Sequence, residues 1–235
     1  MREVPQEEAV VANPRYEKSI TVVTLFFAAI LGFGLNHILE AEHIKPHGII
    51  ADHRWGFFLV AVLIFLRFLT GSANHLWLEY VKYPRVPRFR FRLNLDDVLF
   101  TWDLAWLTVF GCLGVAICYA KNENTFFLLT ALLLAAALIW SLLDWEFRRR
   151  RWRSEIGNWA PTWITLNVIQ LVVVLWCWLL GFLGSLLGYW LTALVMDRAL
   201  SLRLLIVGFV SAAVLAVDFY EQLKQLAKPP PASAP

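Results

Sequence analysis

Arg67 lies near the middle of residues 54–83, a largely apolar stretch that we interpret as a membrane-spanning helix. A charge at that depth in a membrane costs about 2.5–3.5 kcal/mol on insertion scales, so it requires a polar partner or water. Gly71 and Asn74 follow four and seven positions later, on the same face of the expected helix. We therefore expect this face to point into the protein, where other helices supply partners for the guanidinium group.

Polar residues also occur in the other apolar runs, mostly toward one side of the membrane. Asp103 lies about 9 Å into its run at 1.5 Å per residue, and Asp218 lies near the end of the last run. We expect Arg67 to pair with Asp103, and Asp144 is the second choice. The predicted intramembrane polar cluster comprises Arg67, Asn74, His75, Asp103, Asp144, Asn167 and Gln170.

Two interpretations of this cluster remain open. It could line a water-filled vestibule or ion path, or it could be a buried ion pair that fixes helix packing. All ten prolines lie outside the proposed spans. Transporters often interrupt helices at the binding site, so this distribution favours the packing interpretation.

A second candidate site is the histidine-rich loop at residues 40–53, which also carries acidic residues. His43, His47 and His53 are ligand types that zinc or copper could use. However, Pro46 interrupts any regular helix that would bring His43 and His47 onto one face. The alternative is a solvated polar loop, and apart from a metal ion here the sequence predicts no cofactor.

The elements that position these residues are apolar helices. The chain has 235 residues, is 59% hydrophobic, contains 12 Trp and 17 Phe, and has a mean hydropathy of +0.60. Several runs are long enough to cross a bilayer, which predicts an all-α, polytopic integral membrane protein with about six transmembrane helices. The expected spans are residues 18–39, 55–79, 97–119 and 124–145, a fifth that starts near 162, and 201–220.

These spans define the expected domain organisation. A cytoplasmic tail covers residues 1–17, a six-span transmembrane domain covers 18–220, and a partly disordered cytoplasmic tail covers 221–235. The fifth apolar run continues to residue 196. We favour one long helix followed by an interfacial segment that ends in Asp197 and Arg198, with two helices as the alternative.

The basic residues predict the orientation. With six spans and a cytoplasmic N-terminus, fifteen Lys and Arg residues fall on the cytoplasmic side and five on the outer side. This positive-inside bias places both termini in the cytoplasm, and we expect a bacterial inner membrane. The predicted basic cytoplasmic face comprises Arg85, Arg88, Arg90, Arg92, Arg148, Arg149, Arg150, Arg151 and Arg153.

These arginines have two interpretations. We expect them to contact anionic lipid head groups. The alternative is a nucleic acid or a soluble acidic partner, since aromatic residues alternate with the arginines.

Known enzyme motifs are absent from the sequence: there is no GxSxG, Walker A or HExxH pattern, and the histidines do not form desaturase-type boxes. The first functional hypothesis is therefore a non-enzymatic membrane subunit, either an anchor or accessory protein or a membrane effector, that forms homo- or hetero-oligomers. The second is an ion channel or small-solute transporter built on Arg67 and Asp103. The third is a metal-handling protein that uses the outer histidine loop.

Overall fold

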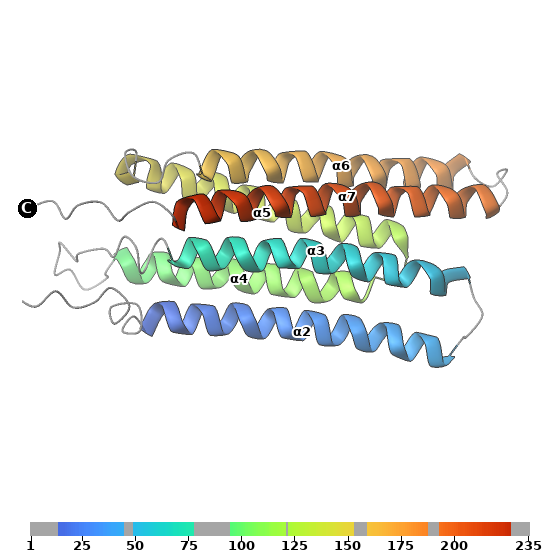
Figure 1. Ribbon diagram of the computed structural model, residues 1–235, viewed down its shortest axis with the longest axis horizontal. Coiled ribbons are helices and arrows are strands. Elements are labelled where there is room, and N and C mark those ends of the chain that lie inside the picture. The colour runs from blue at the N-terminus through green and yellow to red at the C-terminus, as the bar shows by residue number, and fades with distance from the viewer. Residues whose placement is uncertain are drawn as a thin grey trace, which may run out of the picture.

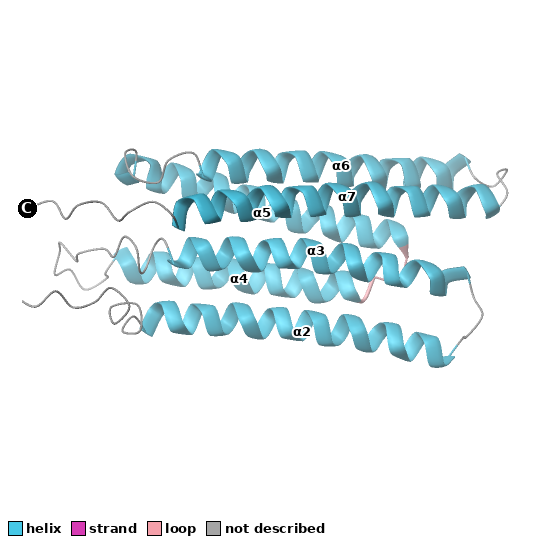
Figure 2. Cartoon of the chain, in the orientation of Figure 1, coloured by secondary structure: helices cyan, strands magenta, loops and turns pink. Residues whose placement is uncertain are grey.

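The computed structural model describes residues 14–44, 49–77, 95–120, 122–152, 159–187 and 193–226. Apart from the short turn before residue 123, these residues are helical (Figure 2). The helices are α2 (Pro14–Ile44), α3 (Ile49–Trp77), α4 (Leu95–Cys118), α5 (Glu123–Trp152), α6 (Trp159–Leu187) and α7 (Ala193–Leu226). All six are long and apolar enough to cross a membrane, which confirms the all-helical fold class and the number of candidate spans.

The six helices lie side by side along the long axis of the molecule, and successive helices run in opposite directions (Figure 1). As a result, α3 and α5 end at the same end of the bundle at which α4 and α6 begin. We call this the arginine end, because these helix ends adjoin the two arginine-rich parts of the sequence. The start of α2 and the end of α7 lie there too.

The most extensive helix contacts join α5 to α6 and α3 to α7, and α2 packs against both α3 and α4. Small residues allow the close approach of α4 to α2: a Cβ atom at Gly111 would overlap the ring of Phe26, and one at Gly114 would lie 2.6 Å from Cδ1 of Ile30. Association of membrane helices depends on such close packing, because lipid is as apolar as the side chains themselves. Large apolar side chains point outward on α6 and α7, as with Phe209, which is 76% exposed.

Several helices extend beyond the apolar runs. In the fifth run, α6 is a single helix that ends at Leu187, as favoured from the sequence. The expected interfacial segment before Asp197 and Arg198 is wrong in part, since α7 already begins at Ala193. The 34 residues of α7 span about 51 Å, more than the roughly 30 Å of a hydrocarbon core. The hydropathy of the sequence predicts only the part of a helix that crosses the bilayer. The helical backbone hydrogen bonds continue beyond that part into the polar ends, so the observed helix is longer than the predicted span.

Two helices begin at residues that are typical of helix N-termini. Pro14 is the first residue of α2, where a missing N–H costs nothing. Before α5, the side-chain oxygen of Asn122 accepts the backbone N–H of Thr125 at 2.8 Å and caps the helix.

Candidate functional site

Arg67, on α3, is fully buried and bonds to side chains of two other helices. Its Nε donates to Oδ2 of Asp218, on α7, at 2.5 Å. Its Nη1 donates to Oδ1 of Asn167 and to Oε1 of Gln170, both on α6 and both at 2.8 Å. We call these four residues the Arg67 cluster. The carboxylate balances the guanidinium charge, and the two amides satisfy further donors.

The spacing of polar residues along α6 and α7 creates this arrangement. Asn167 and Gln170 lie three residues apart on α6 and therefore on one face. Gln170 also donates from Nε2 to Oγ of Ser211 at 2.8 Å, and Ser211 lies two turns before Asp218 on the same face of α7. One continuous set of hydrogen bonds thus joins α3, α6 and α7.

A tryptophan of α6 covers the guanidinium group. The Cζ atom of Arg67 lies 4.4 Å from the ring centroid of Trp163, within cation–π range. Gly71, one turn after Arg67, provides space for this ring, because a Cβ atom there would overlap it. On this face of α3, Arg67 therefore supplies the charged group, and Gly71 leaves the space that the Trp163 ring occupies.

The expected pairing of Arg67 with Asp103 is wrong, and so is the second choice, Asp144. The reason is the helix arrangement: α3 packs extensively against α7 and only slightly against α4. Within the apolar spans, Asp103 also lies close to the arginine end of α4, whereas Asp218 lies further from that end of α7, nearer the depth of Arg67. Most members of the predicted polar cluster thus fall into two separate groups rather than one.

The second group consists of His75 on α3, Asp103 on α4 and Asp144 on α5, which we call the His75 triad. Nε2 of His75 lies 3.7 Å from Oδ1 of Asp103. One donor atom from each of the three residues lies within 4.8 Å of the other two. His75 and Asp103 are buried and Asp144 is partly buried. The ring of Trp140 packs edge-on against His75, with 4.8 Å between centroids.

Asn74 belongs neither to the Arg67 cluster nor to the His75 triad. It is buried on the Arg67 face of α3, and its Nδ2 atom has no hydrogen-bond partner among the described residues. The sequence predicted Asn74 in the same polar cluster as Arg67; it is buried as expected, but no hydrogen bond among the described residues joins it to Arg67.

A third polar group, formed around the buried Arg203, was not recognised from the sequence. Arg203, on α7, donates from Nη2 to Oε2 of Glu123, on α5, at 2.6 Å, and from Nη1 to the backbone oxygen of Cys177 at 3.3 Å. Gly181, on α6, leaves room for it, since a Cβ atom there would overlap Nη1 of Arg203. Both charged residues lie near the end of the bundle opposite the arginine end, and this common depth is a signal that the sequence did contain.

The side chains of the remaining predicted site residues lie outside the part of the chain that the structure describes. His43 is in the helical part of α2 and His53 in that of α3, but their side chains and all of His47 lie outside the described residues. The predicted basic face also lies outside them, although the backbone of α5 extends through Arg148 and Arg151. The outer metal site and the basic face therefore remain predictions.

Comparison with protein-family models, with curated proteins and with solved structures finds no match to this chain. The function must therefore be inferred from the residues of the chain and from their geometry.

Proposed function

We propose that the protein is a non-enzymatic, multi-spanning membrane subunit, an anchor, accessory or effector protein that assembles with itself or with other proteins. The observation that supports this proposal is the enclosure of the Arg67 charge by three helices. Removing one partner from a buried ion pair is strongly destabilising, so such a pair favours one arrangement of helices over others. A subunit that presents a defined surface to partners needs this kind of fixed packing.

The geometry of the Arg67 cluster gives less support to the alternative, a channel or transporter built on Arg67 and Asp103. A transport path requires polar groups that water or solute can reach, whereas Arg67 is 0% exposed and Trp163 covers it. Asp103 belongs to the other polar group, so the two residues do not form a continuous path.

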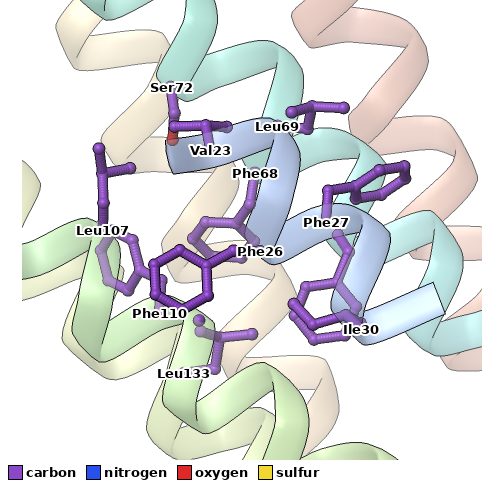
Figure 3. Close-up of a pocket in the computed structure, with 12 residues that line it drawn as sticks. Val23, Phe26, Phe27, Ile30, Phe68, Leu69, Ser72, Leu107, Phe110 and Leu133 are labelled. Atoms are coloured by element: carbon purple, nitrogen blue, oxygen red, sulfur yellow. The ribbon is translucent and has the colours of Figure 1, made fainter. Parts of the chain in front are cut away.

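A pocket of about 40 Å³ that is partly open at the surface of the bundle also fails to provide such a path. It lies between α2, α3, α4 and α5, and its lining is apolar except for Ser72 (Figure 3). Phenylalanine side chains dominate the wall, including Phe26, Phe68 and Phe110. Its chemistry suits apolar contacts rather than ion passage.

The orientation and the partners belong to the same proposal. We infer that the arginine end faces the cytoplasm of a bacterial inner membrane, with both termini there and with anionic lipids against the basic residues. The helix ends that adjoin the two basic regions all lie at one end of the bundle (Figure 1). This supports the proposed orientation. At the lipid-facing surface, Gly184 on α6 has open space around its Cβ position, which would allow a second helix to approach closely.

The proposal is tested by extracting the tagged protein with its native lipids and measuring its mass and co-purifying chains. We expect a homo-oligomer or a complex of fixed stoichiometry. In parallel, liposomes that contain the purified protein should show no more ion or solute flux than empty liposomes.

An Arg67→Leu/Asp218→Leu variant is the matched control for the flux measurement, because it removes both charges and keeps apolar volume at each position. Flux by the wild type that disappears in this folded variant would overturn the subunit proposal and favour the transporter. A monomer with no co-purifying chain would overturn it as well.

A further inference from the structure

The His75 triad has the donor set of a transition-metal site. Three helices, α3, α4 and α5, each contribute one residue, and together they offer one imidazole nitrogen and two carboxylate oxygens. Nitrogen and oxygen donors of these types bind Zn²⁺ at about 2.0–2.2 Å. The two carboxylates would also balance the two charges of the ion in a site where charge is costly.

The distances are close to those that an ion requires. In a tetrahedral zinc site the ligand atoms lie roughly 3.4 Å from each other, given those bond lengths. The His75 Nε2 to Asp103 Oδ1 distance is 3.7 Å, and no pair of donor atoms in the triad is more than 4.8 Å apart. Movements of about 1 Å in side chains alone would therefore bring all three donors onto one ion.

A small cavity beside the triad gives a second, independent indication of a ligand. It has a volume of about 10 Å³, and its lining includes His75, Asp103 and Trp140. The Nε1 atom of Trp140, a buried donor, has no hydrogen-bond partner among the described residues. A cavity of this size holds about one water molecule, and such a water needs polar partners. Sites with three protein ligands commonly leave a fourth position for water.

We propose that His75, Asp103 and Asp144 bind one divalent ion of the zinc class, with a water molecule in the adjacent cavity as the fourth ligand and as the acceptor for Trp140 Nε1. The ion connects α3 to α4 and α5, while the Arg67 cluster connects α3 to α6 and α7. This site lies at the arginine end, opposite the histidine loop that the sequence suggested. Metal binding at the triad does not depend on the proposed subunit function.

The experiment uses the full-length protein in detergent, treated with a chelator and then dialysed separately against Zn²⁺, Co²⁺ and Ca²⁺. Metal content per chain is measured by mass spectrometry. We expect about one Zn²⁺ or Co²⁺ per chain, with visible absorption of Co²⁺ typical of four-coordinate sites, and no Ca²⁺, because Ca²⁺ prefers six to eight oxygen ligands. Zinc should also raise the unfolding temperature, since an ion that binds the folded state stabilises it.

Variants locate the site. His75→Ala, Asp103→Asn and Asp144→Asn should each weaken zinc binding at least tenfold, and Asp144→Asn is the mildest change because that side chain is only partly buried. His43→Ala is the matched control and should bind zinc like the wild type.

Wild-type protein that takes up neither Zn²⁺ nor Co²⁺ overturns the proposal regardless of how the variants fold. Zinc binding that is lost in His43→Ala and retained in Asp144→Asn would also overturn it, and would place the metal at the outer loop instead.

Discussion

Replacing Asp218 by leucine removes the only carboxylate that bonds the buried Arg67 guanidinium among the described residues. The two amide acceptors, Asn167 and Gln170, remain at 2.8 Å, so the cation keeps part of its hydrogen bonding but loses its counter-charge. Breaking one side of a buried pair costs about 3–5 kcal/mol. Because the amides persist, we expect a loss near the lower limit, about 3 kcal/mol, or roughly 150-fold in the folded-to-unfolded ratio.

The double variant Arg67→Leu/Asp218→Leu distinguishes an ion pair from two independent residues. Arg67→Leu alone should also cost about 3–5 kcal/mol, since it leaves a buried carboxylate without its cation. With both charges removed, no buried charge remains unpaired. We therefore expect the double variant to be about 2–3 kcal/mol more stable than the sum of the single changes implies.

The assay is reversible unfolding in mixed micelles with increasing denaturing detergent, followed by fluorescence of the 12 tryptophans. Glu221→Leu is the matched control, because Glu221 lies on the same helix but pairs with the exposed Lys224 at 3.7 Å. Exposed pairs contribute about 0–1 kcal/mol, so this variant should unfold almost like the wild type. Equal losses for Asp218→Leu and Glu221→Leu, or strictly additive losses in the double variant, would refute the role of the buried pair.

Three further predictions concern packing, the second buried charge and orientation. Gly71→Ala should lower the free energy of unfolding by about 1–3 kcal/mol because the new methyl group overlaps the ring of Trp163, whereas Gly32→Ala, with no atom within 4 Å, should be neutral or stabilising in the same assay. Glu123→Gln should cost about 1–2 kcal/mol, as it weakens the bond to Arg203 without removing the acceptor, and an unfolding curve like that of the wild type would contradict this role. A green fluorescent protein fused to the C-terminus should fluoresce and an alkaline phosphatase at the same position should be inactive; the reverse result would place that terminus outside the cytoplasm.

The polar face of α3 shows how far sequence reasoning extends. The cost of an unpaired charge in a membrane and the spacing of Arg67, Gly71 and Asn74 were enough to predict that this face points inward. Arg67 and Asn74 are indeed buried, and Gly71 lies against Trp163. The predicted partner was wrong because several carboxylates in other helices satisfy the same local rules. Choosing among them requires knowledge of which helices are neighbours.

The same limit applies to the proposed metal ligands. His43, His47 and His53 attracted attention because they are near each other in sequence, whereas His75, Asp103 and Asp144 come from three separate helices. Their depth along the apolar runs placed all three in one predicted polar cluster, but the sequence did not indicate that their donor atoms lie within 4.8 Å of one another. Packing of α3, α4 and α5 at the arginine end is what brings them together.

The sequence by itself determined the membrane class, the number of apolar helices and the burial of Arg67, because hydropathy and helical periodicity depend only on residues close together in the chain. The tertiary structure alone decided that α7, rather than α4, supplies the carboxylate for Arg67, and that His75 lies beside Asp103. The physical reason is that apolar helices of similar length pack with many neighbours at nearly equal energy. The arrangement is then selected by details such as the Trp163 ring over Gly71 and the fit of Asp218 to the guanidinium, which depend on side chains distant in sequence.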